Sequence, residues 1–225
     1  MGRVVMLFTD KLNTPGEHGL MLEGLVGPLE AVLTVPEDAD TRYIAFLGHP
    51  HSLQGGTMNN KVVTTMARAF KELHIPSVRF NFRGVGQSGG HYDNGIGESE
   101  DMRKLVRQWH SEQPQAQNIF AGFSFGSYVA YRTASRCEHA LLITIAPPVH
   151  HYHYKEFEPA PHPWLIIQGK EDEVVPFELV SEFASQSSQV LPVIEFGETG
   201  HFFHGKLLIL KEKLMDAVRD QVCLS

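Results

Sequence analysis

The chain is poor in cysteine: its 225 residues include only Cys137 and Cys223. Two cysteines are too few for a disulfide framework, and their spacing is unlike that of a metal site, so a reducing compartment fits this composition. No hydrophobic run is long enough to span a membrane, and the apolar run near the amino terminus is too short for the core of a signal peptide. We therefore expect a cytoplasmic protein with no membrane partner.

Positive charge is also scarce. The chain has 19 Lys and Arg residues against 26 Asp and Glu residues, which gives a formal net charge of −7 at pH 7. This balance gives no indication of a basic surface for phosphates, so we expect no nucleic-acid partner. Hydrophobic residues make up 42% of the chain, enough for a sizeable core at this length. Because no repeat or linker composition interrupts it, we expect residues 1–225 to form a single domain, and no pattern indicates a particular oligomeric state.

What the chain does contain is an alternation of short β-rich runs and helical stretches. Strands that alternate with helices predict right-handed βαβ units and a mostly parallel sheet covered on both faces. The first runs follow each other without helices, which predicts an antiparallel start. The expected strands lie at 4–8, 20–26, 30–35, 43–48, 77–82, 118–123, 140–146, 163–169 and 190–196, and the expected helices at 59–73, 99–111, 125–136, 177–187 and 206–221.

A serine between two glycines follows one of these expected strands. Residues 122–126, Gly-Phe-Ser-Phe-Gly, fit the pattern G-x-S-x-G, in which a sharp turn from strand to helix displays the serine hydroxyl. Glycines on both sides let the strand and the helix approach closely. The amino terminus of the following helix directs free N–H groups toward any oxyanion that forms beside the serine. Ser124 is therefore a candidate nucleophile.

An acid and a histidine follow two later expected strands. Asp172 comes after the strand at 163–169, and His201 comes after the strand at 190–196. Ligand sites in such sheets lie beyond the carboxyl ends of the strands, so these side chains are expected near Ser124. A serine hydroxyl needs an imidazole to take its proton, and the imidazole needs a carboxylate to orient it. The chain order Ser, Asp, His thus predicts a catalytic triad.

These motifs together resemble the α/β-hydrolase superfamily, and in particular small bacterial hydrolases related to dienelactone hydrolase. The resemblance implies a triad of Ser124, Asp172 and His201 on an eight-stranded sheet whose second strand is antiparallel. Dienelactone hydrolase has cysteine at the nucleophile position, whereas this chain has serine, which favours ester or thioester chemistry. The segments that carry the resemblance are GHPHSLQGGTMNNKVV (48–63), RFNFRGVGQSGG (79–90), AGFSFGSYVA (121–130), IAPP (145–148), IQGKEDEVV (167–175) and GHFFHGKL (200–207).

The same resemblance implies the two backbone donors of an oxyanion hole. One is the N–H of Phe125, directly after the serine, and the other maps by position to the N–H of His51 in the loop after the strand at 43–48. Pro50 has no N–H to donate. His49 and His51 form an H-x-H pair, but no third ligand with zinc-like spacing follows, so we expect neither a metal nor a cofactor.

Two other functions compete with a hydrolase. Residues 84–89, Gly-Val-Gly-Gln-Ser-Gly, fit the dinucleotide-binding pattern G-x-G-x-x-G, but the stretch after them continues as a loop to residue 97, and no helix opens at once. In the hydrolases that the chain resembles, this stretch is a structural turn. The second alternative is a triad-bearing fold that serves only as a binding module.

The segment between the expected strands at 140–146 and 163–169 is too short and too rich in proline to form a helical cap. We therefore expect an open, shallow site without a lid. Phe202, Phe203 and the loop at 152–154 are expected to supply its limited apolar wall. The sequence as a whole predicts a serine hydrolase that acts on a small acyl substrate.

Overall fold

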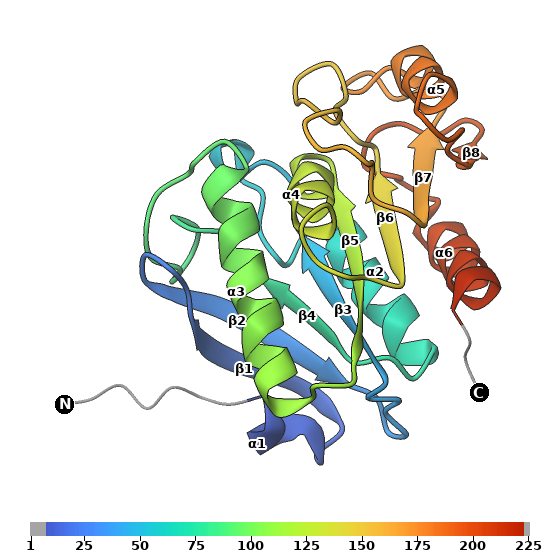
Figure 1. The fold of residues 1–225 in the computed structure, drawn as a ribbon. Coiled ribbons are helices and arrows are strands. Elements are labelled where there is room, and N and C mark those ends of the chain that lie inside the picture. The colour runs from blue at the N-terminus through green and yellow to red at the C-terminus, as the bar shows by residue number, and fades with distance from the viewer. Residues whose placement is uncertain (1–7, 223–225) are drawn as a thin grey trace.

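The computed structural model describes residues 8–222, and the structural statements below concern those residues. Eight strands form one sheet in the order β1-β2-β4-β3-β5-β6-β7-β8, with helices on both faces (Figure 1). The strands are β1 (Gly16–Glu23), β2 (Pro28–Val35), β3 (Tyr43–Gly48), β4 (Ser77–Phe80), β5 (Gln117–Phe123), β6 (Leu141–Ile145), β7 (Trp164–Gly169) and β8 (Val193–Phe196). The helices are α1 (Thr9–Leu12), α2 (Lys61–Glu72), α3 (Ile96–Glu112), α4 (Phe125–Ala134), α5 (Phe177–Ser185) and α6 (Leu207–Gln221), with a 3₁₀ turn, η1, at Ser52–Gln54.

Strand β2 runs antiparallel to both of its neighbours, β1 and β4, and every other neighbouring pair in the sheet is parallel. A short turn at residues 24–27 joins β1 to β2, because antiparallel strands need no crossover. Helices α2, α3, α4 and α5 lie between successive strands from β3 onward, with β6 and β7 joined by a loop. The predicted fold class, a mostly parallel eight-stranded sheet with an antiparallel second strand, is therefore confirmed.

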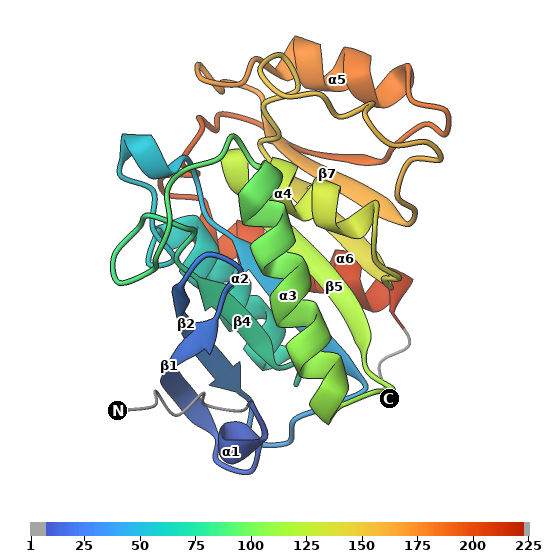
Figure 2. The ribbon, with the colours of Figure 1, turned by 60° about the vertical axis from the view of Figure 1, so that its left-hand side comes forward.

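Helices α2 and α6 cover one face of the sheet, and α3 and α4 cover the other (Figure 2). Side chains of the central strand β3 alternate between these layers: Ile44 and Phe46 pack toward α3 and α4, while Ala45 and Leu47 pack toward α2 and α6. A strand buried on both faces is a continuous apolar run, which explains the sequence YIAFLG. Among residues 8–222, no helix has the length and apolar character needed to cross a bilayer.

The structure differs from the sequence prediction near the start of α3. This helix begins at Ile96, three residues before the expected start, and the preceding Gly95 has a φ of +88°. The carboxylate of Glu98 accepts hydrogen bonds from the N–H groups of Asp93 (2.8 Å) and Gly95 (2.9 Å). A glutamate at the third helical position that reaches back in this way stabilises the first turn. The predicted strand at 4–8 lies outside the described residues except for Phe8, which precedes α1.

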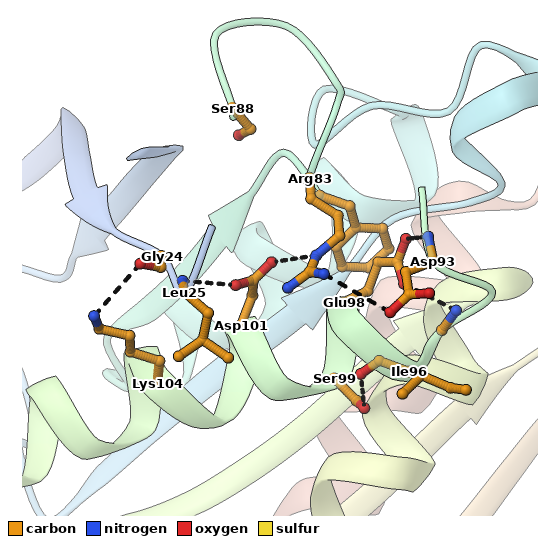
Figure 3. Close-up of polar contacts among 12 residues, drawn as sticks. Gly24, Leu25, Arg83, Ser88, Asp93, Ile96, Glu98, Ser99, Asp101 and Lys104 are labelled. Carbon is orange, nitrogen blue, oxygen red and sulfur yellow. Dashed lines mark hydrogen bonds and ion pairs between the residues drawn. The ribbon is translucent and has the colours of Figure 1, made fainter. Parts of the chain in front are cut away.

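A buried ion pair joins three parts of the chain on the α3 side of the sheet (Figure 3). Arg83 Nε donates to Asp101 Oδ2 at 2.8 Å, and Asp101 Oδ1 accepts the N–H of Leu25 at 3.0 Å. Asp101 is completely buried and Arg83 is almost so. The pair therefore ties the segment after β4 to helix α3 and to the turn between β1 and β2.

Removal of Asp101 tests how much this network stabilises the fold. In Asp101→Ala the guanidinium of Arg83 loses its buried partner, and the Leu25 N–H loses its acceptor, so we expect the free energy of unfolding to fall by about 3–5 kcal/mol. Lys104→Ala, on the same helix, breaks an exposed ion pair with Glu23 and should cost less than about 1 kcal/mol. Urea denaturation of the two variants gives both values, and similar small losses would contradict the prediction.

Candidate active site

Ser124 lies at the turn between β5 and α4, at the carboxyl edge of the sheet. Its φ of 53° and ψ of −123° lie outside the regions that residues with a side chain favour. Its N–H donates to the carbonyl of Ile145 in β6 (2.8 Å), and its carbonyl accepts the N–H of Ser127 (2.9 Å). These bonds hold the strained turn in place and leave the serine side chain half-exposed.

Three glycines allow this turn to form. A Cβ at Gly122 would overlap the carbonyl oxygen of Gly126, and a Cβ at Gly126 would overlap the backbone of Gly48 at the end of β3. Strands β3 and β5 and the start of α4 therefore approach more closely than side chains would permit. Larger residues at these positions would push the helix away from the sheet and move the serine with it.

The structure brings Ser124 together with the other two predicted triad residues. His201 Nε2 lies 3.1 Å from Ser124 Oγ, and His201 Nδ1 lies 2.8 Å from Asp172 Oδ2. Asp172 and His201 are each only 5% exposed, so this chain of contacts is shielded from water except at the serine. An imidazole held between a hydroxyl and a carboxylate can take the hydroxyl proton while the carboxylate stabilises the charge that results.

Asp172 is held by several donors. Its Oδ1 accepts the N–H groups of Val174 (2.9 Å) and Val175 (2.7 Å), and its Oδ2 accepts Gln168 Nε2 (3.2 Å) in addition to the histidine. Its acidic neighbours in the sequence, Glu171 and Glu173, are exposed instead. Gln168 was not among the predicted site residues, although it is the one polar residue in the strand WLIIQG.

A cavity of about 250 Å³ opens beside the serine and the histidine. Phe202 lies on its wall, as expected, and His51 lies there too. The N–H of Phe125 is in the first turn of α4, where helical N–H groups have no partner within the helix. The complete lining is Pro50, His51, Gln54, Gly55, Gly56, Asn60, Ser124, Val174, His201 and Phe202. Sequence reasoning found neither Asn60 nor Val174, because loop residues have no periodicity that shows which way they point.

Phe203 is not on this wall, which corrects the sequence prediction. Its side chain is completely buried and packs edge-on against Phe196, with the ring centroids 5.2 Å apart. The adjacent Phe202 is 45% exposed and lies against His201. Tyr154 is also buried, and its hydroxyl contacts Ser127 Oγ at 2.7 Å, so it offers a substrate little surface.

Comparison with known proteins identifies the family. No family model matches the chain. An α/β serine hydrolase homologue from Coxiella burnetii is 42% identical, with a TM-score of 0.86 and coverage of 96% of this chain and 99% of that one. An α/β serine hydrolase without a lid, from Xanthomonas campestris, is 40% identical, with a TM-score of 0.88 and coverage of 93% and 97%. An uncharacterized protein of Rickettsia prowazekii is 35% identical over 187 residues, which are 79% of this chain and 77% of the relative.

The chain belongs to the α/β-hydrolase superfamily. Like the Xanthomonas protein, this α/β-hydrolase has no lid: among the described residues, the stretch 146–163 between β6 and β7 contains no helix. The stretch is fastened to α4 instead, through an ion pair between Arg132 and Glu156 and a bond from the Phe157 N–H to the Tyr131 hydroxyl (3.3 Å). Glu156 and Phe157 therefore lie against the helix, and no residue of the stretch lines the cavity beside the serine.

The glycine-rich stretch at 84–89 is a structural turn in this α/β-hydrolase. The carboxylate of Glu30 accepts the N–H of Gln87 (2.9 Å), and the Ser88 hydroxyl donates to the carbonyl of Asn81 (2.6 Å). A dinucleotide site needs free N–H groups in this stretch and a helix that starts at once. Here the Gln87 N–H is bonded to Glu30, and α3 begins only at Ile96. The geometry gives no support to the dinucleotide-binding alternative.

His49 and His51 point to different partners. The His49 ring is completely buried, donates from Nδ1 to the Pro50 carbonyl (2.7 Å) and accepts the Phe82 N–H at Nε2 (2.9 Å). Burial lowers the pKa of His49 to about 4. Within residues 8–222, no three His, Cys, Asp or Glu side chains are grouped so that they could hold a metal ion. The ring of His49 therefore fastens the loop after β3 to the segment after β4.

The lowered pKa of His49 predicts how stability depends on pH. A histidine in the unfolded chain has a pKa of about 6.5, so between about pH 6.5 and about pH 4 the unfolded chain binds a proton that the native protein does not. From this residue alone, the free energy of unfolding should fall by up to about 1.4 kcal/mol for each pH unit as the pH drops through that interval.

The variant His49→Asn lacks this contribution and should be less stable than the wild type at pH 7. Its deficit in the free energy of unfolding should shrink by about 2 kcal/mol at pH 5, because the wild type loses stability there that the variant cannot lose. Urea denaturation at the two pH values measures the deficit. A deficit of the same size at both would contradict the buried neutral state of His49.

Proposed function

We propose that this protein is a serine hydrolase that cleaves a small ester or thioester through a covalent acyl-enzyme. The observation that carries the proposal is the contact of Ser124 Oγ with His201 Nε2, with Asp172 behind the histidine, at the wall of a cavity. The close α/β serine hydrolase neighbours support the same class of reaction. A serine at this position, where dienelactone hydrolase has cysteine, supports ester or thioester chemistry.

In the first half of the reaction Ser124 Oγ attacks the carbonyl carbon of the substrate, and its proton passes to His201 Nε2. The tetrahedral oxyanion collapses, the bond to the leaving group breaks, and the histidine gives its proton to the leaving oxygen or sulfur. In the second half a water molecule attacks the acyl carbon and gives a proton to His201. The bond from that carbon to Ser124 Oγ then breaks, and the histidine returns the proton to the serine oxygen. Asp172 keeps Nδ1 protonated throughout, so that Nε2 faces the serine with a free lone pair.

The oxyanion is stabilised by the N–H of Phe125 and, in this proposal, by the N–H of His51. The geometry supports this pairing, since His51 and Ser124 line the same cavity and Phe125 begins α4. Fixed dipoles in a site that is partly shielded from water stabilise the developing charge without a metal or cofactor. Phe202 and Val174 give the cavity its apolar side, and Asn60 and Gln54 give it a polar one.

Substitution of the triad tests the proposal. Ser124→Ala and His201→Ala should lower kcat by about 10⁶-fold, the size of these losses in subtilisin. Asp172→Asn should lower it by about 10⁴-fold, because the nucleophile and the base remain and only the group that sets the histidine tautomer is lost. A fluorophosphonate probe should label the wild type and not Ser124→Ala. Ser135→Ala, a serine at the far end of the same helix, is the matched control and should keep both activity and labelling. A wild type that is neither labelled nor active would favour the non-catalytic binding module.

The small cavity predicts a preference for short acyl groups. Its volume of about 250 Å³ lies below the range of about 300–1,000 Å³ usual for drug-sized ligands, so few methylene groups can be buried. Each buried CH₂ contributes only about 0.8 kcal/mol, and those beyond the cavity contribute little. Across p-nitrophenyl esters of increasing chain length, kcat/KM should peak at short acyl groups and then fall. A maximum at long chains, or a rise in rate at a lipid interface, would show that the cavity extends further.

A further inference from the structure

The side chain of His51 is held at both ring nitrogens. Its Nδ1 accepts the N–H of Leu53 at 3.2 Å, which requires that Nδ1 carry no proton. The ring is therefore neutral, and the hydrogen on Nε2 points to the hydroxyl of Tyr92, 3.2 Å away. Burial also lowers the pKa of the His51 imidazole, which favours the same neutral form.

Tyr92 connects His51 to the other side of the proposed oxyanion hole. Its ring lies with its centroid 5.0 Å from that of His51 and 5.5 Å from that of Phe125. Phe125 is almost completely buried, and its ring also contacts those of His51 (5.1 Å) and Tyr152 (5.5 Å). The side chains of the two residues that supply the proposed N–H donors are thus in contact, and Tyr92 lies against both.

The loop that carries Tyr92 is itself anchored on both sides. The buried pair of Arg83 and Asp101 fixes the start of the loop, and the Glu98 carboxylate accepts the N–H groups of Asp93 and Gly95, directly after Tyr92 (Figure 3). The Tyr92 hydroxyl also lies 3.4 Å from the hydroxyl of Tyr152. Tyr92 is consequently a fixed point against which a neighbouring loop can be held.

We propose that Tyr92 is a positioning residue for the oxyanion hole: its hydroxyl holds the His51 ring, and through it the His51 N–H, in register with the N–H of Phe125. This inference rests on the proposed hydrolase function. Loss of the hydroxyl frees the loop at 50–56 without emptying the space that the ring fills. A displacement of the donor by a fraction of an ångström weakens its bond to the oxyanion more than its contact with the bound substrate.

Tyr92→Phe removes the hydroxyl and keeps the ring contacts. We expect kcat to fall by about 10–100-fold with KM changed by less than about threefold, because the bond is strongest in the transition state. The affinity for a boronic acid that forms a tetrahedral adduct with the serine should fall by a similar factor, while the melting temperature changes little. Unchanged kcat and boronate affinity, or losses that appear only together with a large fall in melting temperature, would overturn the proposal.

Two further variants locate the effect at the bond between Tyr92 and His51. Tyr152→Phe removes only the outer contact of the Tyr92 hydroxyl and should change kcat by less than about threefold. His51→Asn keeps an acceptor for the Leu53 N–H but is too short to reach Tyr92, so it should match Tyr92→Phe. In the double variant that combines Tyr92→Phe with His51→Asn, the two losses in kcat should not add, because both substitutions remove the same hydrogen bond. Additive losses, or an equal loss in Tyr152→Phe, would overturn the assignment.

Labelling of the wild type separates this inference from the function on which it rests. If a fluorophosphonate labels Ser124 and the three single variants keep wild-type kcat, the positioning role fails and the hydrolase function stands. If the wild type is neither labelled nor active on esters and thioesters, both fail together.

Discussion

The close approach of three backbone segments at Gly48, Gly122 and Gly126 is the constraint on which the site depends. Strand β3 brings the loop with His51 to this point, β5 brings Ser124, and α4 starts directly above both. Because no side chain separates them, the hydroxyl, the first N–H of the helix and the loop after β3 meet in one place. The other residues of the site, such as Asp172 and His201, lie in loops that surround this contact.

Those loops are held by buried polar groups that accept backbone N–H bonds. Asp172 accepts the N–H groups of Val174 and Val175, and Glu98 accepts those that precede α3. The ring of His49 does the same for the Phe82 N–H. Each group satisfies donors that the loop could not satisfy itself, which is what a buried backbone requires. The loops at the carboxyl edge thereby gain fixed shapes without regular secondary structure.

Much of the fold could be predicted from the sequence. Strands buried on both faces are continuous apolar runs, and amphipathic helices have a regular apolar periodicity that one exceptional residue does not hide. That the three residues of the proposed triad lie close together was also predictable, since each lies in the segment that follows a strand and the parallel strands end at one edge. The start of α3 was missed because Ile96 and Gly97, the first two residues of the helix, lie inside the stretch taken for a loop. Phe203 was misplaced because two adjacent loop residues of the same type give no indication of which one is buried.

The contact of Tyr92 with His51 could not have been predicted at all, for it joins residues from two loops 41 positions apart in the chain. Sequence patterns reach only along one element, whereas the position of a loop side chain is decided by what the other loops leave free. Gln168 lies in a strand, where its place in an apolar run marked it as unusual, but nothing in that run shows that its amide contacts Asp172. The sequence therefore indicated the residues of the proposed active site better than it indicated the residues that hold them in position.

The three residues of the proposed triad share a further feature. Each lies next to, or within three residues of, a side chain that is buried in the core and fixes the local backbone. Ser124 is flanked on both sides, His201 is followed two residues later, and Asp172 three residues later. These buried neighbours are Phe123, Phe125, Phe203 and Val175. These neighbours fix the backbone from the core side, so the serine can stay open to a substrate and to the water that the proposed mechanism requires.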